Sequence, residues 1–319
     1  MLRFLVRRTL LGALVIWIIS VVVFGLFFVA PSNVARKIAG RQASARTVQQ
    51  IRETLGLDKP ILTQYGEWIW GMLHGDLGFS YYSGVPVTQK LADAVPITVS
   101  LVAGAAVIWV VIGVSGGVLS ATRPRSLADR TVTAFALFFY SMPTFLLGLL
   151  LLYFLFFRLQ LAGFGFFPAC CYVPLTESPL QWAKHMILPW ITLALVLAGT
   201  YIRLTRGSML DALGEDYIRT ARAKGIRESR VTYRHGLRAG LTPVVTQFGV
   251  DIGTAIGGVL ITETVFSLQG LGYTAANSVI RGDLPVIIAV VMLASVFTVV
   301  ANIIVDALYA VLDPRVRLN

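Results

Sequence analysis

Long apolar runs are the feature that most constrains what this chain can fold into. A helix needs about 20 mostly apolar residues to cross a bilayer, and 56% of the 319 residues are hydrophobic while only 13% are charged. One soluble core of this size cannot bury so much apolar surface. The sequence therefore predicts an all-α, polytopic membrane protein, a single transmembrane domain over 1–319 with six transmembrane helices at 9–30, 97–121, 131–157, 187–202, 242–262 and 284–312.

The first apolar run has a second interpretation, because Arg3, Arg7 and Arg8 precede it as they would precede a secretory signal. A signal peptide has an apolar core of only about 7–15 residues and a small-residue cleavage site. This run is longer, and Ala30-Pro31 is a poor cleavage site. We therefore expect the run to remain as a transmembrane helix.

The positive residues predict how the chain lies in the membrane. The net charge of +11 is concentrated in the gaps between apolar runs, where anionic lipid headgroups attract Lys and Arg. Short cytoplasmic loops retain an excess of these residues, and the short loops that would lie outside carry only Arg158, Lys184 and Arg281. We expect both termini and 203–241 in the cytoplasm of a bacterial cell, with 31–96 and 158–186 outside its cytoplasmic membrane.

The outer segment 31–96 is predicted to form an extracytoplasmic cap. Its sequence favours a short helix over 48–55, a turn at 57–60 and a second helix over 61–73. The only cysteines of the chain, Cys170 and Cys171, lie in the other outer loop. Neighbouring cysteines bond only in strained geometry, so free thiols and a disulfide are both open, and no zinc-ligand spacing surrounds them.

A polar, basic segment over 216–243 separates the fourth and fifth apolar runs. Gly225 divides it into two helix-prone stretches, Tyr217–Lys224 and Ile226–Leu237, and glycine permits a bend there. A short amphipathic helix can lay one face in the groove of a partner, and Tyr217, Ala221 and Lys224 fall on one such face. The segment is either a loop that only sets topology or a coupling helix that contacts a soluble partner.

Signatures of catalysis and of nucleotide binding are missing from the sequence. It contains no G-x-x-x-x-G-K-[ST], G-x-S-x-G or H-E-x-x-H pattern. We expect no enzyme activity, no catalytic residue, no metal and no cofactor in this chain. Energy for any transport must then come from another chain or from an ion gradient.

Three acidic residues are predicted to lie at membrane depth, where ionisable groups usually face a bundle interior or a water-filled path. Asp251 lies in the fifth run and either lines a transport path or pairs with an arginine. Asp306, in the sixth run, is expected to form a packing pair. Glu263, at the outer end of the fifth run, is expected to anchor an outer gate, with Gly257 and Gly258 on the path or gate.

Short motifs spread along nearly the whole chain carry a resemblance to a known family. They are the opening MLRFLVRRTL, Ala30-Pro31, Ser141–Phe145, Leu188-Pro189, Asp216–Gly225, His235–Arg238, Gly257-Gly258, Glu263–Ser267, Gly270–Gly272, Asp283–Pro285 and Leu312–Arg315. With these motifs the polar segment resembles the EAA loop of ABC importer permeases, and the chain is similar to the oligopeptide, dipeptide and nickel permease family, the OppB/DppB kind. Residues 219–221 read Arg-Thr-Ala where the general pattern has Glu-Ala-Ala, and Gln269 replaces a common proline.

The resemblance implies the permease of a type I ABC importer. It implies a second permease, two ATP-binding subunits that carry ATP and Mg²⁺, an external substrate-binding protein, and alternating access driven by ATP. The substrates would be short peptides, with nickel chelates or glutathione as alternatives. An ion-coupled transporter, the competing class, would show repeated halves, and none is visible. The residues implied to couple to the ATPase are Asp216, Tyr217, Thr220, Ala221, Arg222, Ala223, Lys224 and Gly225.

Overall fold

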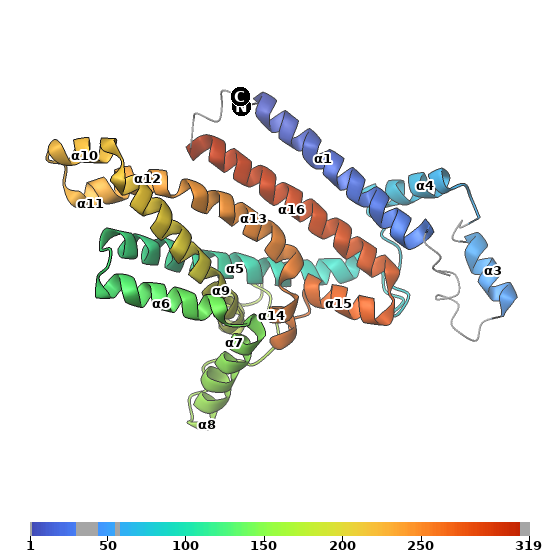
Figure 1. Ribbon diagram of the computed structural model, residues 1–319. Helices are drawn as coiled ribbons and strands as arrows, with labels where there is room; N and C mark the ends of the chain where they lie inside the picture. The colour runs from blue at the N-terminus through green and yellow to red at the C-terminus, as the bar shows by residue number, and fades with distance from the viewer. Residues whose placement is uncertain (1, 30–43, 55–57, 313–319) are drawn as a thin grey trace.

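The computed structural model describes residues 2–29, 44–54 and 58–312. Within these ranges the regular structure is helical, and the only pairing of extended backbone is an isolated bridge between Phe79 and Pro86. The predicted all-α class is confirmed. The helices form an elongated bundle, with a group of short helices at each end (Figure 1).

Two long helices, α5 (Val87–Thr122) and α9 (Pro179–Gly214), form the centre of the bundle. Small residues let them approach closely: a Cβ added at Gly104 would lie 2.1 Å from the Trp190 ring, and one at Gly113 would lie 2.2 Å from the Tyr201 Cβ. Such glycines favour helix contact where lipid supplies no hydrophobic driving force. The Trp190 indole also donates to the carbonyl of Ser100 at 2.8 Å.

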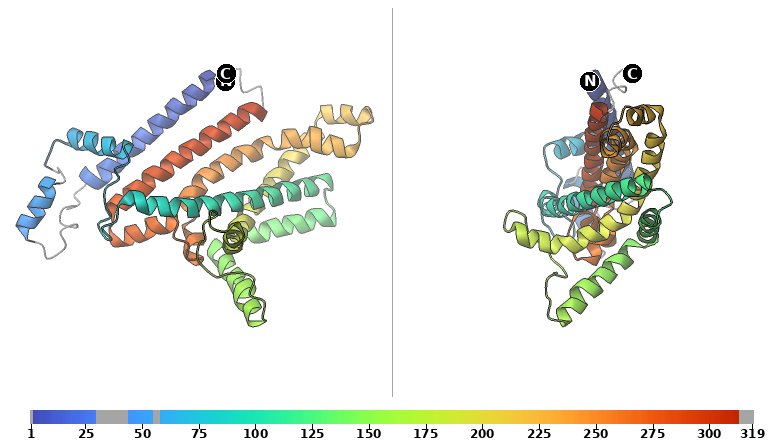
Figure 2. Two further views of the ribbon diagram at one scale, coloured as in Figure 1. Left: turned by 180° about the vertical axis from the view of Figure 1, so that it is seen from behind. Right: turned by 90° about the vertical axis from the view of Figure 1, so that its left-hand side faces the viewer.

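The predicted third span, 131–157, is wrong as one continuous helix. The chain forms α6 (Leu127–Ser141), breaks at Met142 and Pro143, and continues as α7 (Thr144–Leu151), the π-helix η2 (Leu152–Arg158) and α8 (Leu159–Leu161). Proline lacks an N–H and forces the preceding residue toward extended backbone, and Met142 has ψ of 128°. The α7–α8 segment therefore turns away from α6 (Figures 1 and 2).

Among the described residues, five helices are long and apolar enough to cross a membrane: Val6–Phe27, Val87–Thr122, Thr144–Leu161, Pro179–Gly214 and Leu284–Ala307. The helix at the predicted fifth span, α13 (Thr242–Gly258), has 17 residues and is followed after Val259 by α14 (Leu260–Val265). The chain is thus a polytopic membrane protein, and the count of six spans stays a prediction.

Two predicted spans are shorter than the helices that contain them. α5 begins at Val87, before the predicted 97, and α9 extends on both sides of 187–202. Ser178 caps α9 by accepting from the backbone N–H of Gln181 at 3.4 Å, with Pro179 at the first helical position. Hydropathy detects only the apolar part of a helix, so the predicted span ended at 202, whereas residues 203–214 continue the same helix.

The outer helices of the bundle are α1 (Leu2–Phe24), continued by η1 (Gly25–Val29), and α16 (Leu284–Leu312). They lie side by side, and a Cβ at Gly12 would come 2.5 Å from Val299. The predicted helix over 61–73 is present as α4 (Ile61–Leu73), whose Tyr65 bonds Ser20 of α1 at 2.8 Å. The helix predicted over 48–55 is α3 (Ala45–Thr54). Residue 30 of the predicted first span and residues 31–43 and 55–57 of the predicted cap lie outside the described part.

Candidate functional site

The polar segment folds into a compact unit at one end of the bundle (Figure 1). It begins with α10 (Asp216–Ala223), directly after α9, and continues through α11 (Glu228–Arg230), η3 (Val231–Gly236) and α12 (Leu237–Gly240). This short helix held on a bend is what the sequence predicted. The unit contains every residue predicted to couple to an ATPase.

Gly225 forms the bend after α10. Its φ is +71°, in the left-handed region that favours glycine. Two hydrogen bonds close the turn, from the N–H of Gly225 to the carbonyl of Arg222 at 2.9 Å and from the N–H of Ile226 to the carbonyl of Ala221 at 3.3 Å. This pattern is a Schellman motif. The predicted bend at Gly225 is therefore confirmed.

The inner face of α10 is apolar and packs within the unit. Ile218 and Val231 are fully buried, Ala221 is 8% exposed, and Ile226 packs against the cluster that these three form. Sequence reasoning placed Ala221 on the same face as Tyr217 and Lys224, and the structure corrects this. Ala221 belongs to the internal cluster, whereas the outward face carries Asp216, Tyr217, Thr220, Ala223 and Lys224.

Ion pairs brace the turn from outside. The Arg222 guanidinium meets the Glu228 carboxylate with two contacts, Nη2 to Oε1 at 2.7 Å and Nε to Oε2 at 3.2 Å. This bond lowers the pKa of Glu228 and raises the pKa of Arg222. Arg219 contacts Asp216 at 3.3 Å within α10. Both pairs are exposed, so each contributes at most about 1 kcal/mol to stability, and of the two only the pair between Arg222 and Glu228 crosses the turn.

The unit is attached to the spanning helices through two glycines. A Cβ at Gly236 would lie 2.9 Å from Leu213 of α9, and one at Gly240 would lie 2.8 Å from the sulfur of Met209. Met209 is fully buried. α12 thus rests directly on α9 and leads through Leu241 into α13. α10 is therefore linked to α9 directly and, through α12, to α13.

A second polar cluster, missed from the sequence, joins the α5–α6 turn to α9. Asp129 accepts from Arg206 at 2.8 Å (Nε to Oδ1) and 3.0 Å (Nη2 to Oδ2), from the hydroxyl of Ser120, and from the backbone N–H of Arg125 at 2.8 Å. These bonds, led by Arg206, hold the pKa of Asp129 below its ordinary 3.8. The Ser126-x-x-Asp129 capping pattern at the start of α6 was the available signal.

Asp251, in α13, is partly exposed and has uncharged partners. The Tyr201 hydroxyl donates to Oδ2 at 2.8 Å and the Gln247 amide donates to Oδ1 at 2.9 Å. In the part of the chain that the structure describes, no cation lies within ion-pair distance of it. The structure therefore does not have the ion pair between Asp251 and an arginine that was one of the two alternatives. The sequence analysis did not predict Tyr201 or Gln247 as partners of Asp251.

Glu263 is fully buried and fixes the start of α15 (Leu271–Arg281). Its Oε1 accepts from the Thr98 hydroxyl at 2.5 Å and its Oε2 from the backbone N–H of Tyr273 at 2.8 Å. A Cβ at Gly270 would lie 2.1 Å from Oε1, which explains the glycine there. A carboxylate at a helix N-terminus is favoured by the helix dipole, so Glu263 anchors the start of α15, and its role in an outer gate stays a prediction.

Gly257 and Gly258, predicted to lie on the path or gate, are the last two residues of α13. The surroundings of their side chains lie outside the described part.

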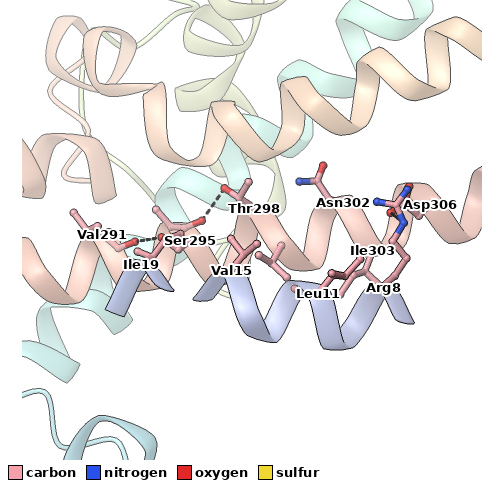
Figure 3. A pocket seen from close by; sticks show the side chains of 13 residues that line it. Arg8, Leu11, Val15, Ile19, Val291, Ser295, Thr298, Asn302, Ile303 and Asp306 are labelled. Atoms are coloured by element: carbon pink, nitrogen blue, oxygen red, sulfur yellow. Dashed lines mark hydrogen bonds and ion pairs between the residues drawn. The ribbon is translucent and has the colours of Figure 1, made fainter. Parts of the chain in front are cut away.

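Asp306 pairs with Arg8 at 3.1 Å, as expected of a packing pair. The pair closes one end of a groove of about 520 Å³ between α1 and α16, with walls that include Leu11, Val15 and Ile303 (Figure 3). Cys170 and Cys171 are joined in a disulfide.

Comparison with known proteins identifies the family. Residues 113–318 match the family described as binding-protein-dependent transport system inner membrane component, and residues 1–102 match the N-terminal region of such membrane components. The chain is 37% identical to the dipeptide transport system permease protein DppB of Escherichia coli, over 99% of each chain. It is 39% identical to the glutathione transport system permease protein GsiC of Pectobacterium atrosepticum, again over 99% of each.

A Brucella abortus protein with the provisional name of a peptide transport system permease is 38% identical over 98% of each chain. These full-length matches agree with the resemblance carried by the polar segment, and they leave the ion-coupled class without support. The chain is a transport subunit and not an enzyme. It belongs to the binding-protein-dependent transport system inner membrane components, as an OppB/DppB-like permease of an ABC transporter.

Proposed function

We propose that this chain is one permease subunit of an importer that moves short peptides across the bacterial inner membrane. Its similarity over almost its whole length to relatives named for peptide, dipeptide and glutathione transport carries this proposal. Glutathione is itself peptide-like, so it is the second candidate substrate, and the relative named for it shares 39% identity with this chain.

The transporter in this proposal contains a second permease, two ATP-binding subunits and an external substrate-binding protein. ATP and Mg²⁺ bind to the ATP-binding subunits, because this sequence has no phosphate-binding loop. The outward face of α10 docks on one of them. The support is its exposed side chains, among them Tyr217 at 45% exposure, on a helix that the internal cluster holds in place.

The contacts suggest how ATP-driven movement reaches the membrane. When the ATP-binding subunits close, they displace α10, and the contact of α12 with α9 carries the displacement to the spanning helices. Asp251 of α13 bonds Tyr201 of α9, so relative movement of these helices changes what this carboxylate faces. In our proposal Asp251 lines the path, and alternating access follows from the reorientation of α9 and α13.

The proposed orientation has both termini and 203–241 in the cytoplasm, with 31–96 and 158–186 outside. The support is the arginine distribution and the position of α10–α12 at the opposite end of the bundle from α3, α4 and α15 (Figure 1). Single cysteines introduced into a chain free of Cys170 and Cys171 test it. A cysteine at Ser44 that reacts only from the cytoplasmic side would contradict this orientation.

Uptake by cells with and without this chain tests the proposed substrate. Labelled peptides from dipeptide to octapeptide, glutathione and a nickel chelate are supplied at equal concentration. We expect uptake of at least one peptide length to depend on the chain. Chain-dependent uptake of glutathione or the chelate, with none of any other peptide, would replace the first proposal by the alternative.

A further inference from the structure

A polar cavity of about 350 Å³ lies at the outer end of the bundle, between the start of α5, α15 and the turn into α16. α15 lies beside the start of α5 in both views (Figures 1 and 2). The volume is at the lower end of the range for small-molecule sites. The cavity is apart from the coupling loop and from Asp251, and its charged lining residues are Lys90, Asp93, Arg281 and Asp283.

Arg281 gives the cavity a positioned cation without an acidic partner. Its guanidinium carbon lies 4.0 Å from the centre of the Tyr82 ring, a cation–π contact that fixes the side chain. Within the described part of the chain no carboxylate lies within ion-pair distance of it. The charge of Arg281 is therefore available to an anionic group in the cavity.

Lys90 and Asp283 neutralise each other and form the wall of the cavity. The Lys90 ammonium lies 3.7 Å from the Asp283 carboxylate and donates to the Ser80 hydroxyl at 2.9 Å. Asp283 is 2% exposed and also accepts from the Ser80 hydroxyl and from the backbone N–H of Tyr81, the latter at 2.9 Å. Since these donors occupy it, Asp283 is a structural residue and not a ligand.

Asp93 gives the cavity an exposed anion. It lies on α5 one turn after Lys90, but Lys90 is held by Asp283, and no described cation pairs with Asp93. Among the described residues, the cavity therefore holds one cation and one anion that form no ion pair with a residue of opposite charge. Such an arrangement is complementary to a zwitterion, whose ammonium would meet Asp93 and whose carboxylate would meet Arg281.

We propose that this cavity binds the two charged ends of a dipeptide- or tripeptide-sized substrate at the outer mouth of the transporter. The proposal rests on the proposed function in peptide import. A peptide is a zwitterion near neutral pH, since its α-carboxyl and α-amino groups titrate at about 3.5 and about 7.8. A sphere of 350 Å³ is roughly 9 Å across, and an extended residue adds up to about 3.6 Å, so only a short peptide brings both ends inside.

The test measures binding of isotope-labelled dialanine to the whole transporter in nanodiscs, without the external binding protein. N-acetylated and C-amidated dialanine are compared with the free peptide. With wild-type protein, blocking either end should weaken binding about tenfold or more. In Arg281→Gln the effect of C-amidation should disappear while the effect of N-acetylation remains, and Asp93→Asn should show the reverse.

Controls separate this site from general damage and from other partners. Arg281→Lys should retain the preference for a free carboxylate, and Arg158→Gln, which removes an exposed cation outside the cavity, should behave as wild type. An unchanged cost of C-amidation in Arg281→Gln would overturn the proposal. The proposal would also be overturned if Arg281→Gln weakened docking of the ligand-free binding protein but kept the preference for a free peptide carboxylate. Absence of peptide uptake by wild-type cells would refute the proposed function itself.

Discussion

Replacing Gly225 by alanine should destabilise the turn that follows α10. A Cβ at this position would meet no atom within 4 Å, so the change adds no collision. The φ of +71° nevertheless costs an L-residue about 1–2 kcal/mol. Alanine stiffens the unfolded chain, which offsets about 0.4–1 kcal/mol. The net cost is about 1 kcal/mol, so the ratio of closed to open turn falls about fivefold.

Opening this turn also loosens α10 relative to the rest of the polar segment. The hydrogen bond from Ile226 to Ala221 and the ion pair between Arg222 and Glu228 both cross it. We expect faster hydrogen exchange at the amides of α10 in Gly225→Ala, with normal membrane levels and reduced coupling of ATP hydrolysis to uptake. Gly225→Asn should fall between wild type and alanine, because asparagine tolerates the left-handed region better.

Gly207→Ala is the matched control. Gly207 lies inside α9, has no neighbouring atom near an added Cβ and is not at positive φ, so alanine there should be neutral or slightly stabilising. Exchange at α10 and coupled uptake are measured in all three variants. If Gly225→Ala matches Gly207→Ala in both measurements, the turn does not hold the coupling helix and our reasoning about Gly225 is refuted.

Three further substitutions test the membrane part of the account. Asp251→Asn should change uptake while the transporter stays assembled, and a complex that dissociates would make Asp251 a packing residue. Glu263→Gln replaces one of two accepting oxygens by an NH₂ group that cannot accept, so the free energy of unfolding should fall by about 1–3 kcal/mol; an unchanged melting temperature would contradict the anchor. Asp129→Asn should lower the melting temperature at pH 7. Folding lowers the pKa of Asp129 below 3.8, so its carboxylate stabilises the fold above that pH and loses this effect as the pH falls further. The melting temperature of the wild type should therefore approach that of the variant in acid. A difference in melting temperature that persists in acid would refute the role of the pair between Asp129 and Arg206.

Local signals in the sequence predicted local structure well. The helix over 61–73 and the bend at Gly225 both depend on residues near each other in the chain, and both are present. The break at Pro143 was missed although the proline is visible, because an apolar run was taken as a single helix. The apolar character of Thr131–Phe157 is real, but the backbone at Met142 is extended.

Contacts between helices could not be predicted in the same way. Thr98 and Glu263 are 165 residues apart in the chain, and Tyr201 and Asp251 come from different helices. Neighbouring residues of a helix point about 100° apart. Span boundaries read from hydropathy are uncertain by about 2–4 residues, so they do not show which side chains of two helices face each other. The same limit explains Ala221: its residue type suggested close packing, but not whether the neighbour is an ATPase or Val231.

The central claim is that the outward face of α10 docks on an ATP-binding subunit, and tryptophan at Ala223 tests it most directly. Ala223 is exposed on that face, so the added bulk leaves the internal cluster untouched, and overpacking a docked contact costs about 1–3 kcal/mol. Ala239→Trp, at an exposed position of α12, is the control. We predict normal membrane levels of both, with ATP-binding subunits recovered on the Ala239→Trp permease and at least several-fold less on Ala223→Trp. Equal recovery on the two variants would contradict the claim that α10 is the docking element.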